Sequence, residues 1–463
     1  MCWLLKCLLV VCVWWTGQVE CGKNYATALS KSILFLNTQR SGKLPINNPI
    51  PWRGDSGLND CVVGGWYDAG DHVKFGQPMA SAATILLWSL YRFKDAYSST
   101  ATLDSMYDMI KWPLDYFLNA WNASAQQFVA QIGDGNTDHA YWGRPEDMTM
   151  VRPCIYINTT FKGSDVLGET VAALAAGSIT FQAKGAIFYS EQLYSAAKSL
   201  YAFAMDNRGL YNGSRGFYDS TSESDEMCNG AMWLYRATND STYLDYARTL
   251  ADFNVPWSYD WDNKQASCLL LLYEETHEDK YQQALVNYFD SWLPGGTMDY
   301  TPCGLAWRFK WGSLREMANT AFLALLAAES GIQTIRLRQW AVQQINYILG
   351  DNNFNGGCFS FQIGVGNKYP LQPHHRAASC PDKPAPCGWD NFNSPLPNPH
   401  VLQGALVGGP LVDDSYEDKR DNYVLNEVST DYNAGYQGAL SGLLHLENLN
   451  SLPIVASKCP CLD

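Results

Sequence analysis

Charged residues are scarce in this sequence, and positive charge is scarcer than negative charge. Charged side chains make up 17% of the 463 residues, and 32 Lys and Arg against 46 Asp and Glu give a net charge of −14. Nucleic acids and anionic membrane surfaces attract basic proteins, so this balance argues against both as partners. The chain is nevertheless globular, because 47% of its residues are hydrophobic and can form a large core.

Long hydrophobic runs are also missing beyond the N-terminus, which argues against a membrane anchor. Residues 1–21 contain one early lysine, Lys6, then an apolar run from Cys7 to Trp15, then small and polar residues. This pattern is typical of a secretory signal peptide. We therefore expect a secreted, extracellular protein whose mature chain is 22–463. Sequons for N-glycosylation agree with export, and they begin at Asn122, Asn158, Asn212 and Asn239.

Several catalytic and metal motifs are absent. No CxxC pair lies near suitably spaced histidines, which argues against a zinc clip. No HExxH and no G-x-S-x-G motif occurs, which disfavours a metallopeptidase and a serine hydrolase. Most of the 14 cysteines lie beyond the signal peptide. In an oxidising compartment some of them will form disulfides, but their spacing does not give the pairing.

The sequence has no Ser- or Pro-rich linker, no repeat of fixed period and no alternating strand pattern, so we expect one all-α domain. Apolar residues at helical spacing predict twelve helices, at about 25–39, 80–96, 103–121, 167–181, 188–205, 226–237, 242–253, 264–275, 281–293, 318–329, 335–349 and 433–446. Several form pairs with short links, which suggests six inner helices, apolar nearly all round, inside six outer amphipathic ones.

Five long segments separate these helices: 40–79, 122–166, 206–225, 294–317 and 351–431. Long loops in a compact domain usually carry function. Gathered at one rim of a ring of helices, they would form an open cleft.

The first of these loops contains the stretch WYDAGDHVKF, with Asp68 and Asp71 on either side of an Ala-Gly step. An acidic turn with Asx hydrogen bonds is the simplest interpretation. A calcium loop is another, although the alternating acids of an EF-hand are absent. A third is a pair of functional carboxylates, because flanking aromatic residues would make a partly dry site where each perturbs the other.

A third acid, Glu427, stands among Val and Tyr residues in YVLNEVSTDYNAG. It could simply interact with the N-terminus of the following helix. In an apolar setting, however, burial would raise its pKa and keep it protonated near neutral pH. A further polar stretch, QPHHRAASCPD, holds His374, His375 and Arg376. Adjacent histidines on an extended segment point to opposite sides, which favours hydrogen bonding over a shared metal.

Taken in order, GGWYDAGDHVKF, DHAYWGRPEDM, WGSLREMANTAFLAL, QPHHRAASCPD and NEVSTDYNAG resemble glycoside hydrolase family 9. The resemblance runs from about residue 25 to 450. It implies an (α/α)6 barrel with an open cleft that cleaves internal β-1,4 bonds of cellulose with inversion. By the same resemblance, Asp71 is the general base, Asp68 its partner in holding the water, and Glu427 the general acid.

The resemblance also implies ligand sites. The residues that match the family's glucosyl-binding positions are His139, Trp142, Trp257, Trp311, Arg315, His374, Arg376 and Tyr432. For each tryptophan, core packing is the alternative. No cofactor is implied for the chemistry, but a structural calcium is, at Thr221, Ser222, Asp225, Glu226 and Asp262. For Asp225 and Glu226, charge at a helix N-terminus is the alternative.

The sequence departs from the family pattern at a few positions. Glu316 stands where an aromatic residue is usual and could pair with Arg315, Gln77 replaces an apolar residue, and the tail SKCPCLD could carry a disulfide. Nothing resembles an appended carbohydrate-binding module, so the cleft itself must hold the β-1,4-glucan substrate. We expect a monomeric endoglucanase. The alternatives are a catalytically weak or inactive carbohydrate-binding relative and a glycosidase with another β-glucan specificity.

Overall fold

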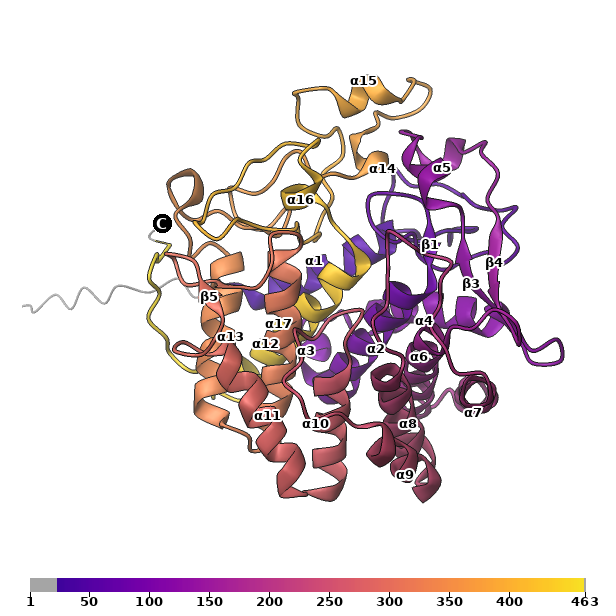
Figure 1. Cartoon of the computed structure of the whole chain (residues 1–463). Coiled ribbons are helices and arrows are strands. Elements are labelled where there is room, and N and C mark those ends of the chain that lie inside the picture. The colour runs from indigo at the N-terminus through magenta and orange to yellow at the C-terminus, as the bar shows by residue number, and fades with distance from the viewer. Residues whose placement is uncertain (1–22, 462–463) are drawn as a thin grey trace, which may run out of the picture.

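A computed structural model describes residues 23–461, so the expected signal peptide lies outside the described residues. The described chain forms two concentric rings of helices, as predicted (Figure 1). The inner helices are α2 (Gly76–Arg92), α6 (Ser164–Ala183), α8 (Ser224–Thr238), α10 (Gln265–Thr276), α12 (Ser313–Glu329) and α17 (Thr430–Asn448). The outer helices are α1 (Tyr25–Thr38), α4 (Leu103–Ala120), α7 (Ile187–Asp206), α9 (Ser241–Leu250), α11 (Asp279–Trp292) and α13 (Thr334–Ile348).

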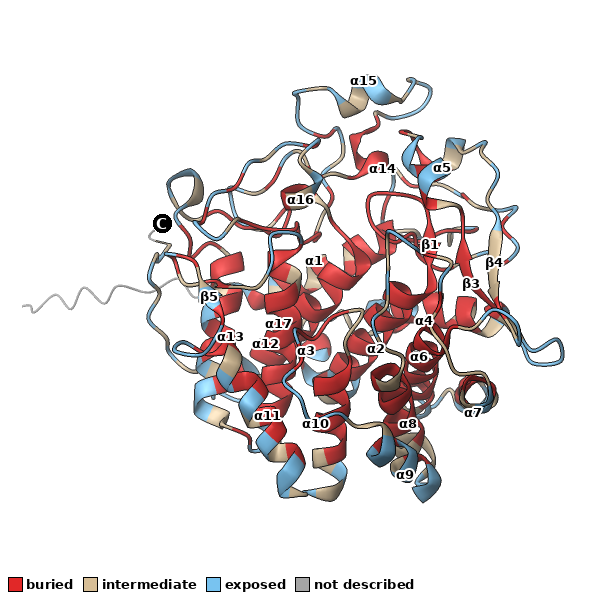
Figure 2. Cartoon of the chain, in the orientation of Figure 1, coloured by how far each residue is buried: buried red, intermediate tan, exposed pale blue. Residues whose placement is uncertain are grey.

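Burial separates the two rings as the apolar patterns indicated (Figure 2). Nearly every residue of α6 and α12 is buried, whereas in α9 only Tyr243 and Ala247 are. Helix α6 has the length and composition of a membrane span, contrary to the expectation that no later stretch would. However, 83% of that stretch is buried inside the protein, as befits an inner helix of a barrel.

Small residues bring two inner helices into close contact. A Cβ on Gly168 of α6 would lie 2.7 Å from the backbone of Glu226, and a Cβ on Gly230 of α8 would lie 2.7 Å from the carbonyl oxygen of Gly168. Only glycine fits at these two positions, because any side chain would push the helices apart.

The helix boundaries differ most at the rim that carries the loops. Helix α2 begins at Gly76 rather than Ala80, and α12 begins at Ser313 rather than Ala318. These first turns are buried on almost every side. They therefore lack the apolar-polar alternation that marks a helix in the sequence.

The shorter elements lie in the connecting segments. A small antiparallel sheet has β3 (Gln127–Ile132) paired with β1 (Lys74–Phe75), β2 (Trp121–Asn122) and β4 (Cys154–Ile157), and β5 (Asp299–Tyr300) pairs with β6 (Ala306–Trp307). The short helices are α3 (Lys94–Ser99), α5 (Gly135–His139), α14 (Arg376–Ser379), α15 (Trp389–Phe392) and α16 (Tyr423–Asn426), with 3-10 turns η1 (Pro145–Asp147) and η2 (Phe354–Gly356). Helices α5, α14, α15 and α16 gather at one end of the barrel, at the top of Figure 1.

Five disulfides cross-link the described chain: Cys61–Cys154, Cys228–Cys268, Cys303–Cys459, Cys358–Cys461 and Cys380–Cys387. The second of these joins inner helices α8 and α10. The third and fourth fix the C-terminal segment to the barrel, which confirms the expectation of a disulfide in this tail.

Candidate active site

The loops at this end of the barrel enclose a cleft with a volume of about 700 Å³. Each of the five predicted loops contributes to its lining, through Asp68, His139, Tyr218, Trp311 and Glu427 in chain order. A sixth segment, between α9 and α10, adds Trp261, which the sequence analysis missed.

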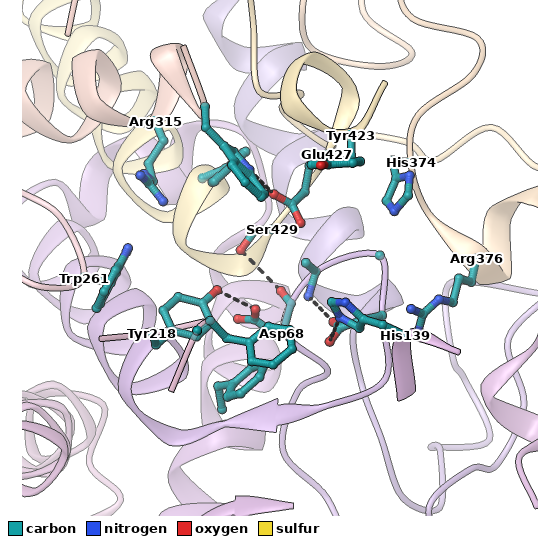
Figure 3. A pocket seen from close by; sticks show the side chains of 18 of the residues that line it. Asp68, His139, Tyr218, Trp261, Arg315, His374, Arg376, Tyr423, Glu427 and Ser429 are labelled. Carbon is teal, nitrogen blue, oxygen red and sulfur yellow. Dashed lines mark hydrogen bonds and ion pairs between the residues drawn. The ribbon is translucent and has the colours of Figure 1, made fainter. Parts of the chain in front are cut away.

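The three predicted catalytic acids all line this cleft. In Figure 3, Glu427 projects from one side, and Asp68 lies on the opposite side next to Tyr218 and His139. The two sides come from separate loops, since Asp68 and Asp71 precede β1, whereas Glu427 follows α16.

Backbone contacts hold these loops together. The amide of Arg376 donates to the carbonyl of Gly70, and the amide of Thr430 donates to the carbonyl of Asp68. A Cβ at position 70 would lie 2.1 Å from the carbonyl oxygen of His374. Gly70 therefore allows the Asp68–Asp71 loop to lie directly against the segment that carries the two histidines.

The neighbours of Asp71 lower its pKa and so favour its ionised form. Its Oδ1 accepts from the amide of Ala69 at 3.1 Å, and Nε2 of His139 lies 3.6 Å from its Oδ2. Burial alone would raise the pKa of Asp71, but the nearby imidazole of His139 and the charge of Arg376 lower it below its usual value.

The pKa of Asp68 is shifted in the opposite direction. Its Oδ2 accepts a hydrogen bond of 2.5 Å from the hydroxyl of Tyr218, and its Oδ1 is buried without a partner. Burial first, and then the negative charges of Asp71 and Asp431, raise the pKa of Asp68 well above its usual value. The two carboxyl groups therefore differ: the surroundings of Asp71 favour its ionised form, and those of Asp68 favour its protonated form.

The surroundings of Glu427 favour its protonated, carboxylic-acid form. Its Oε2 accepts from the indole N–H of Trp311 at 2.6 Å and from the hydroxyl of Tyr432 at 3.2 Å. Burial raises the pKa of Glu427 to about 7 in spite of these hydrogen bonds. The alternative, an interaction with the N-terminus of the following helix, is not what the structure shows: Ser429 is the N-cap of α17, Asp431 is the acid in its first turn, and Glu427 lines the cleft.

The neighbouring histidines point to different places, as predicted. His374 lines the cleft, and its Nδ1 lies 2.7 Å from the carbonyl oxygen of Arg420. His375 is buried beneath, where Nε2 lies 3.0 Å from Oε1 of Gln39. Burial lowers the pKa of His374 to about 4, so its ring is neutral in the cleft.

Arg376 lines the cleft and forms a buried ion pair with Asp138, a residue that the sequence analysis missed. Asp71, Asp138 and His139 place ligand atoms within 4.8 Å of one another, the one such group of His, Cys, Asp and Glu in residues 23–461. Asp138 is already paired with Arg376. In this arrangement His139 and Arg376 lower the pKa of Asp71.

Seven of the eight predicted glucosyl-binding residues line the cleft: His139, Trp142, Trp311, Arg315, His374, Arg376 and Tyr432. Trp257 does not. It lies under the guanidinium of Arg308 with 47% of its surface exposed, and its ring centroid is 6.2 Å from that of Phe309, which does line the cleft. Trp142 is buried and donates to the hydroxyl of Ser379, so packing is its main role.

Two of the departures from the family pattern are buried near the cleft. Glu316 is fully buried and accepts from two nitrogens of Arg315, at 2.9 and 2.5 Å, which confirms the predicted pair. It fixes Arg315 against Asp431 and over the ring of Tyr432. Gln77 is buried and donates to the carbonyl of Trp261.

Two aromatic lining residues, Phe75 and Tyr423, were expected as neighbours of the acids. The rest of the aromatic lining was not predicted from the sequence: Phe217, Tyr218, Trp261, Phe309, Trp389 and Phe392. The many aromatic residues of the loops indicated that some of them would line a cleft. The sequence does not distinguish a lining residue from a core residue, because the difference depends on which segments lie close together in three dimensions.

The predicted calcium residues come from two stretches of the chain. Thr221 and Ser222 precede α8, Asp225 and Glu226 lie in its first turn, and Asp262 precedes α10. The amide and hydroxyl of Thr221 donate to Asp262 at 2.7 and 2.8 Å. One carboxylate oxygen of Asp225 and both of Glu226 are buried without partners. Unpaired buried carboxylate oxygens are what a hard cation would satisfy, but one ligand atom each of Asp225, Glu226 and Asp262 do not all lie within 4.8 Å of one another in this structure.

Comparisons with known proteins point to one family. The sequence model of glycosyl hydrolase family 9 matches residues 25–440. Endoglucanase A of Bacillus pumilus is 42% identical over 93% of this chain and 68% of its own. The endoglucanase structure from the termite Nasutitermes takasagoensis shares 46% identity and a TM-score of 0.88, over 92% of this chain and 99% of that one.

A Clostridium thermocellum endoglucanase, CelQ, crystallised with cellotetraose, has 37% identity and a TM-score of 0.83, over 94% of this chain and 72% of that one. The match to the family model covers most of the sequence and includes all three acids of the cleft. The protein therefore belongs to glycosyl hydrolase family 9.

Proposed function

We propose that this protein is a secreted endo-β-1,4-glucanase that hydrolyses internal bonds of cellulose and related β-glucans with inversion at the anomeric carbon. The observation that carries the proposal is that Asp71 and Glu427 line one cleft from two facing loops, where the neighbours of Asp71 lower its pKa and burial raises the pKa of Glu427 to about 7. Hydrolysis with inversion needs one carboxylate and one carboxylic acid, roughly 6.5–9.5 Å apart, with a water between the base and the sugar.

In this mechanism Glu427 protonates the glycosidic oxygen of the leaving chain as its bond to the anomeric carbon breaks. Asp71 accepts a proton from the water that attacks the opposite face of the same carbon. Asp68 helps hold that water, and Tyr218 fixes Asp68. After each turnover Asp71 carries the proton and Glu427 lacks one, so both must exchange with solvent before the next.

The cleft suits a neutral, extended sugar chain. Aromatic rings line both sides, with Trp311 and Tyr423 near the acid and Phe217, Tyr218 and Trp261 across from them. Such rings can stack on the apolar faces of pyranose units, while neutral His374 and cationic Arg376 bond to hydroxyls.

The test is hydrolysis of carboxymethylcellulose, followed by both reducing ends and viscosity. Wild type should lower viscosity quickly while producing few new ends. Asp71→Asn and Glu427→Gln should each lose at least about a hundredfold in rate, because each removes one proton-transfer partner. NMR of the first product should show the α-anomer.

Asp290→Asn, which changes an exposed acid on α11, is the matched control and should stay fully active. An inactive wild type that still binds the polymer would instead favour a carbohydrate-binding protein. Slow viscosity loss with many new ends would contradict endo attack. Full activity in either acid variant would contradict the roles given to Asp71 and Glu427.

We further propose a structural calcium held by Thr221, Ser222, Asp225, Glu226 and Asp262. It would neutralise buried negative charge beside the cleft and take no part in the chemistry. The unpartnered oxygens of Asp225 and Glu226 support it.

Export and a monomeric state complete the proposal. Five disulfides suit an oxidising compartment, and Asn122, Asn212 and Asn239 are exposed, as glycosylation would require. Detection of the cleaved, glycosylated chain in culture medium and its mass in solution would test both points.

A further inference from the structure

A rigid loop at the edge of the cleft, residues 380–400, presents an exposed tryptophan to the cavity. Trp389 begins α15, lines the cleft, and keeps 46% of its surface exposed. We infer that Trp389 is a specificity-determining residue: an outer stacking platform that binds a glucosyl unit remote from the bond being cleaved, and so favours longer chains. This inference rests on the proposed function.

The loop is anchored by the buried residue Arg420. Its guanidinium donates to the carbonyls of Asn391, Phe392, Ser394 and Leu396 and to the side chain of Asn398. The carbonyl of Arg420 also contacts Nδ1 of His374, which lines the cleft. One buried residue therefore fixes the position of α15 relative to the polar groups of the site.

The other end of the loop is equally constrained. Arg144 donates to the carbonyls of Pro381 and Ala385, and Cys380–Cys387 closes this stretch with a disulfide. A pre-organised aromatic ring binds with little loss of conformational entropy.

Trp389 lies outward from the catalytic centre along a chain of contacts. The charge of Arg376 acts on Asp71, and its guanidinium lies 5.7 Å from the ring of Trp142. The ring centroid of Trp389 lies 5.8 Å from that of Trp142 and 5.3 Å from that of Phe392. Phe392 and Trp142 support one part of the indole, and the part that stays exposed is available to a sugar ring.

The alternative is that Trp389 only covers Trp142. A cover would contribute to stability and would affect substrates of every length equally. A platform would contribute only when the chain is long enough to reach it. The dependence on chain length therefore separates the two.

The experiment measures kcat and KM on soluble cello-oligosaccharides, from cellotriose to cellohexaose, for wild type, Trp389→Ala and Trp389→Phe. In Trp389→Ala, KM for the longest substrates should rise roughly two- to tenfold with kcat unchanged, since stacking remote from the reaction contributes equally to ground and transition states. The shortest substrates should be unaffected, and Trp389→Phe should recover most of the loss. Tyr246→Ala, which removes an exposed ring on distant α9, is the matched control.

Equal kinetics for Trp389→Ala and wild type at every length would overturn the inference, as would an equal loss at every length accompanied by a lower Tm. Calorimetric titration of cellohexaose into Glu427→Gln and Glu427→Gln/Trp389→Ala tests the same contact without turnover. If wild type were inactive, this titration would still decide about Trp389, so the two proposals can fail separately.

Discussion

At the scale of single residues, the site depends on two carboxyl groups whose pKa values move in opposite directions. Burial alone would raise the pKa of both Asp71 and Glu427. Their neighbours make the difference between the two shifts. Asp71 has the imidazole of His139 and the charge of Arg376, whereas Glu427 has only neutral donors. The pH dependence of kcat/KM should reveal these contacts, because it reports groups of the free enzyme.

His139→Gln should move the acidic limb of the kcat/KM profile to higher pH. The base must be ionised, and loss of His139 removes a nearby imidazole that keeps the pKa of Asp71 low. His400→Gln is the matched control, because His400 stacks on Trp52 and does not line the cleft. An acidic limb that stays in place in His139→Gln would show that Asp71 is not the base or that His139 does not control it.

The basic limb should report Glu427 and fall near pH 7 in wild type, because an acid with a pKa of about 7 is lost above that value. Trp311→Phe should move this limb to higher pH, since it removes the 2.6 Å hydrogen bond to the carboxylate. Tyr432→Phe should give a smaller shift in the same direction, because its hydrogen bond is longer, at 3.2 Å. A shift to lower pH in either variant would contradict the assignment of Glu427 as the acid.

At the scale of elements, the base loop and the histidine loop form one unit through the contact of Gly70 with His374. Gly70→Ala should cost about 1–3 kcal/mol of folding free energy or more, because the new Cβ would lie 2.1 Å from a carbonyl oxygen. Activity should fall further than stability alone explains, since the displaced loop carries Asp71. Denaturant unfolding and kcat measure the two effects.

Gly388→Ala is the control, because a Cβ there meets no atom within 4 Å. Near-normal activity of Gly70→Ala would mean that the two loops can separate without disturbing the acids.

The elements also show what the sequence could and could not predict. All twelve barrel helices were predictable: outer helices such as α9 bury one face at helical spacing, and inner helices such as α6 and α12 are long stretches buried nearly all round. The short strands were not, because β1, β5 and β6 have two residues each and carry no pattern. The three acids were found through motifs, whereas Asp138 and Trp389 were not, because their roles depend on Arg376 and Arg420, which are far from them in sequence.

At the scale of the whole molecule, the barrel holds a group of acids that carry more protons when folded than when unfolded. Burial raises the pKa of Asp165 to about 6, and burial and the charge of Asp225 raise that of Glu226 well above its usual value. The contribution of Asp165 to stability is therefore complete below about pH 4, where the unfolded chain is also protonated, and is lost as pH rises through about 6. The raised pKa of Glu226 makes its contribution change with pH in the same direction.

A bound calcium would reverse this loss, because the ion stabilises the same carboxylates once they ionise. In EDTA, Tm should fall as pH rises from 4.5 to 8, and calcium should restore it at pH 7 but have little effect at pH 4.5. Asp225→Asn should weaken this response, whereas the exposed Asp290→Asn should keep it. Equal Tm values with EDTA and calcium across the range would contradict the site, and would mean that these carboxyl groups are satisfied by protons alone.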